Sequence, residues 1–96
     1  MKRINKYSLP MSGDAIWVPA NAEILSIQTN RRRVLVYALV DPQEKELKTL
    51  LYKIIPTGGP VKDVEGYNFM GSIRLTADVG YYHVFIKEVL APAANE

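Results

Sequence analysis

The chain of 96 residues contains no cysteine and a single histidine, His83, and these shortages exclude several kinds of chemistry. Without cysteine there can be no disulfide framework, no thiolate nucleophile and no cysteine-based zinc site. One histidine cannot supply a metal site that needs several imidazole ligands from one chain. The sequence therefore gives no reason to expect a metal or any other cofactor.

Long apolar runs are missing as well. No stretch comes near the roughly 18 apolar residues that a membrane-spanning helix requires. The charged start Met1-Lys2-Arg3 is not followed by the apolar segment of a signal peptide. We therefore expect a cytoplasmic protein that makes no contact with a membrane.

An excess of charge of either sign is also lacking, because 12 Lys and Arg side chains face 10 Asp and Glu side chains. The net charge of +2 makes nucleic acid an unexpected partner, since phosphate backbones are normally bound by a concentrated basic face. The charge is uneven, however. Residues 1–33 carry six basic and two acidic side chains, and residues 34–96 carry six and eight. The first third is the part expected to face an anion.

The strongest structural signal in the chain is its run of seven apolar residues, Val34 to Val40. Strand side chains alternate between faces, so Val34 and Val36 would point one way, and Leu35 and Tyr37 the other. Since both faces are apolar, the pattern predicts a central strand covered on both sides. Asp41-Pro42 would end it, because proline cannot donate to the ladder of a sheet.

Alternating polarity and turn residues predict six further strands, over 2–9, 15–18, 23–29, 47–55, 67–76 and 81–89. In the third strand of the chain, Leu25 and Ile27 are expected on one face. In the sixth, Phe69 and Ile73 are expected on one face, with Gly71 between them as a sign of a bulge.

Residues 42–55 allow two interpretations. Leu47, Leu50, Leu51 and Ile54 have helical spacing, and Asp41 with Pro42 could begin a helix. The segment also fits a strand, because Leu50, Tyr52 and Ile54 alternate with Thr49, Leu51, Lys53 and Ile55. We favour a polar turn over 42–46, with at most a short helical turn near 42–47, followed by a strand over 47–55.

Together these patterns predict an all-β protein. About seven short, mostly antiparallel strands would form a small sandwich or a partly closed barrel. Residues 1–90 would be a single domain, and residues 91–96 a flexible tail. A tight hairpin tip is expected at Asn30-Arg31, and another hairpin turn at 78–80.

Several stretches resemble a family of short, uncharacterised proteins associated with bacteriophages. They are Ile4–Leu9, Val18–Gln28, Tyr37–Pro42, Thr57–Pro60, Gly71–Ile73 and His83–Phe85, so the resemblance covers nearly the whole chain. Typical members show Leu-Pro-x-x-Ala-x-Ile-Leu-Ser-Val-Gln, Trp-Ala-Leu-Val-Asp, Gly-Thr-Gly-His-Pro and Trp-His-Val-Phe. The resemblance implies a phage accessory protein in the cytoplasm of the host, but it brings no known activity.

This chain departs from the family pattern at four positions. Pro56 and Gly59 stand where the loop usually has glycine and histidine, and Tyr37 and Tyr82 stand in place of tryptophans. The missing loop histidine removes support for a shared histidine-based chemistry.

The candidate binding residues form three groups. Arg31, Arg32 and Arg33 could hold a phosphate or carboxylate bidentately, although consecutive strand side chains splay, so at most two could converge on one ligand. The alternative is a solvated turn.

The second group is Thr57, Gly58 and Gly59. A plain turn is the preferred explanation of these residues, although their backbone N–H groups could form the rim of a pocket. The third is Tyr81, Tyr82 and His83, where a tyrosine could stack on a base. No acid near His83 in the sequence could orient it as a base, so a structural or ligand-contacting role is preferred to a catalytic one.

The functional expectation is a non-enzymatic phage-type accessory protein that counters a host defence by binding. It would sequester an anionic nucleotide signal or occlude a host protein, and it would form a homo-oligomer through open sheet edges. Two alternatives remain: a structural or assembly component of a virion, and a nucleic-acid-binding β-barrel module.

Overall fold

Seven strands make up most of the computed structural model, which describes residues 1–75 and 80–90, without the side chain of residue 90. They are β1 Arg3–Leu9, β2 Ala15–Pro19, β3 Glu23–Asn30, β4 Arg33–Val40, β5 Leu47–Pro56, β6 Asn68–Arg74 and β7 Tyr81–Leu90. Each corresponds to a strand predicted from the sequence. The described residues contain no helix, so the all-β prediction is confirmed.

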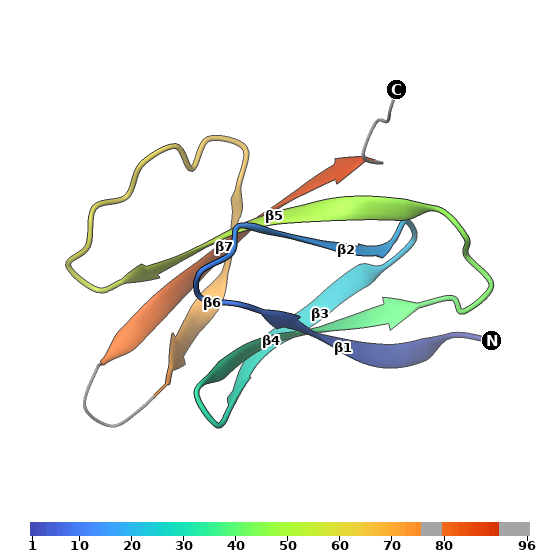
Figure 1. The fold of residues 1–96 in the computed structure, drawn as a ribbon, viewed down its shortest axis with the longest axis horizontal. Coiled ribbons are helices and arrows are strands. Elements are labelled where there is room, and N and C mark those ends of the chain that lie inside the picture. Colours follow the sequence, from blue (N-terminus) through green and yellow to red (C-terminus); the bar gives the residue numbers. More distant parts are fainter. Residues whose placement is uncertain (76–79, 91–96) are drawn as a thin grey trace.

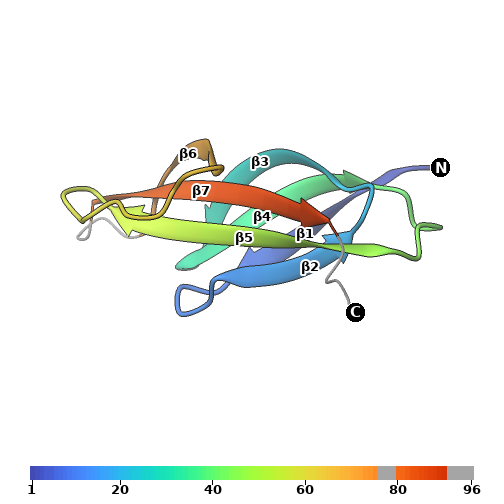
Figure 2. The same ribbon diagram turned by 90° about the horizontal axis from the view of Figure 1, so that it is seen from above.

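The strands form two antiparallel sheets that pack against each other (Figures 1 and 2). One sheet has the order β1-β4-β3 and the other β2-β5-β7-β6. The two sheets also touch along one edge, where β3 contacts β6. Neither sheet closes on itself, so the sandwich is the correct one of the two predicted architectures.

The core lies between the two sheets and takes side chains from both of them. Its buried members are Leu9, Val18, Ala22, Val34, Val36, Ala38, Val40, Leu50, Tyr52, Ile73, Val84 and Ile86. The inward positions of β4 are all in this set, which agrees with the pattern from which the strand was predicted.

The expectation that a layer covers β4 on both sides is wrong. The second face of β4, which carries Leu35, Tyr37 and Leu39, points outward from the three-stranded sheet. Leu35 is nevertheless only 6% exposed, while Tyr37 and Leu39 are partly exposed. Strand neighbours on β1 and β3 shelter these side chains in place of a third layer.

A polar turn, not a helix, connects β4 to β5. The N–H of Glu44 donates to the carbonyl of Asp41 at 3.0 Å, and the N–H of Gln43 donates to the Asp41 carboxylate at 3.0 Å. This carboxylate–backbone bond stabilises a turn because it takes the place of a backbone hydrogen bond. The preferred interpretation of residues 42–55 is confirmed.

Two bulges reverse the predicted alternation of side chains. The register of β6 against β7 shifts between Phe69 and Gly71, where Gly71 has a φ of 144°. The bulge at Gly71 is therefore confirmed, but it places Phe69 and Ile73 on opposite faces instead of one. Phe69 is 57% exposed and Ile73 is 7% exposed.

The second bulge lies in β3 between Ile24 and Ser26. It leaves Leu25 46% exposed while Ile27 packs against the core. The prediction that Leu25 and Ile27 share a face is therefore wrong, because the extra residue of a bulge reverses the faces on its two sides.

The expected hairpin between β3 and β4 is present, but its tip lies one residue later than predicted. Asn30 pairs with Arg33, so the two turn residues are Arg31 and Arg32. Of the hairpin turn predicted at 78–80, only residue 80 is described, and the predicted tail at 91–96 lies outside the described residues.

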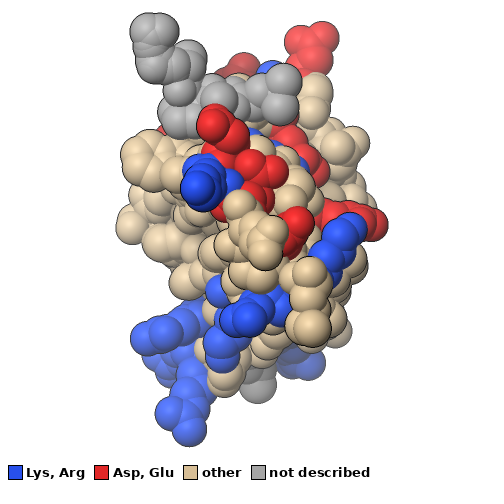
Figure 3. Space-filling model, turned by 90° about the vertical axis from the view of Figure 1, so that its right-hand side faces the viewer, with Lys and Arg blue, Asp and Glu red and all other residues tan. Residues whose placement is uncertain are grey.

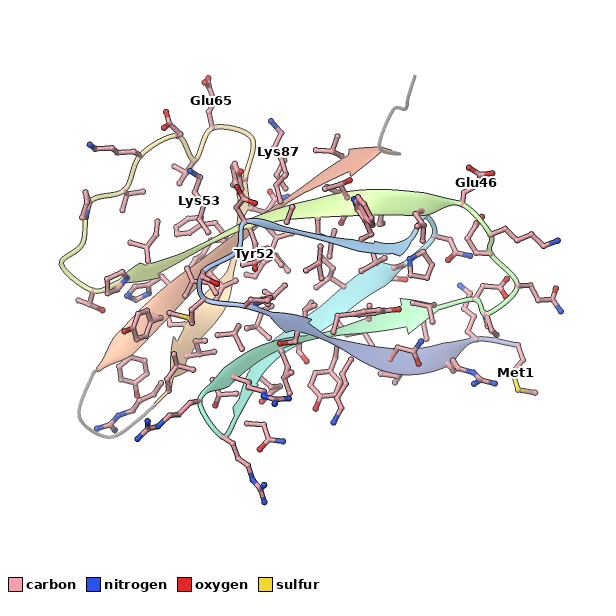
Figure 4. The ribbon with its side chains drawn as sticks, in the orientation of Figure 1. Met1, Glu46, Tyr52, Lys53, Glu65 and Lys87 are labelled. Atoms are coloured by element: carbon pink, nitrogen blue, oxygen red, sulfur yellow. The ribbon has the colours of Figure 1, made fainter. Side chains whose placement is uncertain are left out.

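Two polar side chains of β5 join the four-stranded sheet to the loops that connect the two sheets. Lys48 is only 6% exposed, and its Nζ donates to the Ala22 carbonyl and to Glu88 Oε1, both at 2.6 Å. The Tyr52 hydroxyl, from the middle of β5, donates to the Pro10 carbonyl at 2.7 Å. Tyr52 is the tyrosine labelled near the centre of Figure 4.

Candidate functional site

The turn between β3 and β4 holds two arginines in the left-handed backbone region. The φ angles are 52° for Arg31 and 69° for Arg32. A two-residue hairpin turn with two positive φ angles has the type I′ form, which Asn-Gly adopts most readily. For a residue with a Cβ, this conformation costs roughly 1–2 kcal/mol. We call residues Asn30 to Arg33 the arginine turn.

A solvent-open hollow beside this turn is lined by Asn30, Arg31 and Arg33. Thr29 and Val34 pair on the inner side of the sheet, so the next pair, Asn30 and Arg33, points outward. Two of the three arginines thus converge on one hollow, and Arg32 is not among its lining residues.

The three arginines have no acidic partner among residues 1–75 and 80–90. The single ion pair found there joins Lys48 to Glu88, and all three arginines are exposed. The arginine turn lies at the lower end of the molecule in Figure 1. In the lower part of Figure 3, which has the same vertical direction, the charged side chains are Lys and Arg. An anion could therefore approach the hollow without meeting a carboxylate from the described residues.

A second cluster surrounds His83 at the other sheet. Thr57 Oγ1 lies 2.7 Å from His83 Nε2, and Ser72 Oγ lies 2.7 Å from His83 Nδ1. The Thr57 hydroxyl also lies 3.2 Å from the Tyr81 carbonyl. Ser72 comes next to His83 because these two residues pair across β6 and β7.

The donors and acceptors of this cluster can be assigned. A carbonyl only accepts, so the single proton of the Thr57 hydroxyl points to Tyr81. His83 Nε2 must then donate to Thr57, and in a neutral ring Nδ1 accepts from Ser72. A protonated ring would also be satisfied, since Ser72 can accept as well as donate. The cluster holds the imidazole in place through two hydroxyls, without a carboxylate.

The remaining predicted residues divide between the loop after β5 and the two faces of β7. The N–H of Gly59 donates to the Pro56 carbonyl at 2.9 Å, and Gly58 has a φ of 88°. Residues 56–59 thus form a reverse turn whose central residues are Thr57 and Gly58. Tyr81 is 50% exposed and lies on the face of His83, whereas Tyr82 points inward and packs against the core.

The predicted residues therefore do not form one site. The arginine turn points outward from the β1-β4-β3 sheet, and Thr57, Tyr81 and His83 lie on the outer side of the β2-β5-β7-β6 sheet. Sequence reasoning also missed two contacting residues, Asn30 and Ser72. Both become visible only through strand register, because each stands opposite a predicted residue, Arg33 and His83 respectively.

No three His, Asp or Glu side chains in the described part of the chain gather closely enough to hold a metal ion. Nor does any helix within the described ranges have the length and hydropathy needed to cross a membrane.

The fold and these two surfaces define a small two-layer β domain whose polar clusters lie on its outside. The chain belongs to a family described as a domain of unknown function (DUF7352), which matches residues 1–95. No curated protein matches the chain. No solved structure matches it either.

Proposed function

We propose that this protein acts without catalysis, by binding a phosphate-bearing ligand through the arginine turn. The observation that carries the proposal is the left-handed conformation of Arg31 and Arg32. Asn-Gly would form this turn with less strain. The two arginines therefore weaken the fold locally, and local strain of this kind is characteristic of binding sites.

The chemistry of the turn suits a phosphate group. Guanidinium groups bind phosphate oxygens in a planar, bidentate manner, and Arg31 and Arg33 both border the hollow. The Asn30 side chain adds an amide that can donate to the same group. Guanidinium planes also stack on bases, which extends the proposal from phosphate to a nucleotide.

The biological setting that we propose is counter-defence in a bacteriophage, by sequestration of a nucleotide signal. The resemblance of this chain to phage-associated sequences supports that setting. Occlusion of a host protein is the alternative within the same setting. A homo-oligomer is part of the proposal, since the edge strands of both sheets offer pairing surfaces.

Isothermal titration calorimetry at low salt tests the proposal, with pyrophosphate, cyclic oligonucleotides and cyclic ADP-ribose isomers as probes. The wild-type protein should release or absorb heat with at least one of them. The double substitution Arg31→Asn and Arg32→Gly, which installs the preferred turn residues, should abolish that heat.

The matched control is the double substitution Lys2→Gln and Lys6→Gln. It also removes two positive charges, but from exposed positions at the start of the chain. It should bind as the wild type does. The proposal is wrong if no probe gives heat, or if both double variants lose binding equally.

A further inference from the structure

The outer face of the β2-β5-β7-β6 sheet, the side turned away from β1-β4-β3, carries unusually exposed aromatic rings. Trp17, the only tryptophan, is 63% exposed. Phe69 is 57% exposed and Tyr81 is 50% exposed. Large apolar side chains grouped on one exposed face mark an interaction surface more often than a solvated one.

Strand register shows how these rings are arranged. Trp17 pairs with Thr49 on β5, at one corner of the face. Lys53, Phe85 and Phe69 form a row across β5, β7 and β6. The Phe69 and Phe85 rings are 5.4 Å apart between centroids, and the Phe69 and His83 rings 6.4 Å. From Tyr81 to Val89, the face extends about 27 Å along β7 at 3.4 Å per residue.

The outward side chains of the four strands carry positive charge only. Its central strands present Lys53 and Lys87, and Figure 4 shows both side chains on the same side of the sheet. The four strands contain one acid, Glu88, which pairs with the buried Lys48. Lys53 and Lys87 form no ion pair with any residue of the described ranges. Glu65 lies in the loop between β5 and β6, on the same side of the sheet as Lys87, and its side chain points beyond the lysine (Figure 4).

Lys53 and a further cation of the sheet, Arg74 of β6, lie over rings. Lys53 Nζ is 5.5 Å from the centroid of Tyr67, and the Arg74 guanidinium is 5.8 Å from that of Tyr81. Aromatic rings interleaved with cations suit a partner that has both flat bases and phosphates. A second copy of the chain suits the face poorly, because two-fold packing of this sheet on itself would bring Lys53 and Lys87 towards the same lysines of the other copy.

We infer that this outer face binds single-stranded nucleic acid. Bases stack on Phe69, Phe85 and Trp17, and phosphates lie against Lys53 and Lys87. Four-stranded sheets with exposed aromatics bind single strands in this way. The low net charge of the protein does not oppose this, because the single acid of the four strands, Glu88, pairs with Lys48 and does not point to the face. The inference is independent of the arginine turn, which points outward from the other sheet.

The position of Trp17 provides the test. Titration with a twelve-residue oligo(dT) should quench its fluorescence, and a polyphosphate without bases should not.

Phe69→Ala, a change at an exposed position, should weaken oligo(dT) binding at least about fivefold, the lower end expected for one stacked base. Lys53→Gln with Lys87→Gln should reduce the slope of log K against log salt by about 1.4, because each phosphate contact contributes about 0.7.

The matched control is Lys2→Gln with Lys6→Gln, which should leave the quenching unchanged. Absence of quenching by oligo(dT) would overturn the inference. So would equal weakening by the control pair. Self-association in sedimentation experiments that Phe69→Ala abolishes would assign the face to a second copy and would overturn it as well.

Discussion

Arg31 and Arg32 occupy the two central positions of one hairpin turn, and both have positive φ angles, 52° and 69°. A positive φ is unfavourable for an arginine, because its Cβ approaches the following carbonyl oxygen. The two arginines should therefore destabilise the fold, although they place two positive charges at the turn. The double variant Arg31→Asn, Arg32→Gly should therefore be more stable than the wild type by about 1 kcal/mol, since the relieved strain exceeds the entropy cost of the new glycine.

Thermal unfolding followed by circular dichroism measures this effect. A gain of about 1 kcal/mol raises Tm by roughly 4–8 °C in a domain of this size. The control Arg31→Lys, Arg32→Lys keeps both charges and both left-handed residues with a Cβ, so its Tm should not rise. An unchanged Tm in the Asn-Gly variant would show that the turn is not strained.

The contact between Lys48 and Glu88 predicts an unequal response to loss of either partner. The Lys48 side chain is 7% exposed and that of Glu88 is 48% exposed. Glu88→Ala leaves a buried ammonium without its counter-charge, and we expect a loss of about 2 kcal/mol, less than for a fully buried pair. Lys48→Met leaves a carboxylate that water can reach, and should cost under about 1 kcal/mol.

Urea unfolding of the two variants checks that order, with Lys2→Met as the control for the same substitution at an exposed position. Lys48→Met could instead prove the more destabilising variant. The lysine would then contribute more to the free energy of unfolding than Glu88 does, and the account of this contact would be wrong.

Tyr52 predicts a stability change at high pH. Burial and, secondarily, the Asp14 carboxylate raise the pKa of its hydroxyl above the ordinary 10.0. The unfolded chain then releases this proton at a lower pH than the folded chain. The contribution of Tyr52 is fully present below pH 10.0 and is lost as the pH rises from there towards the folded pKa.

Tyr52→Phe removes both the titration and the hydrogen bond to Pro10. It should cost about 1 kcal/mol at pH 8, and its deficit relative to the wild type should shrink above pH 10.0. Urea unfolding at several pH values measures the difference, and Tyr37→Phe, on the outer side of β4, is the matched control. A deficit that stays constant up to pH 11 (roughly one unit above the ordinary tyrosine pKa) would contradict this assignment.

All seven strands were predictable because each shows a local pattern bounded by turn residues, which is the apolar run for β4 and alternating polarity for the others. Asp41-Pro42 and Gly58-Gly59, for example, mark strand ends without reference to the rest of the chain. The bulge at Gly71 was predictable from a glycine in an apolar position. Its consequence for Phe69 was not, because the change of face depends on which residues of β7 stand opposite.

The candidate sites were harder to predict for the same reason. Arg31 and His83 stand out by residue type, but their partners Asn30 and Ser72 are set by register between strands. The division of the predicted residues into two surfaces follows from which sheet each strand joins. Long-range packing decides which sheet a strand joins, and the alternation of side chains along one segment gives no information about it.

The most direct test of the central claim is a two-dimensional ¹H–¹⁵N NMR titration of the wild-type protein with pyrophosphate. Binding at the arginine turn predicts the largest amide shifts at Asn30 to Arg33, and the loss of those shifts in the Arg31→Asn, Arg32→Gly variant. Shifts centred on any other segment, or shifts that persist unchanged in that variant, would contradict the claim.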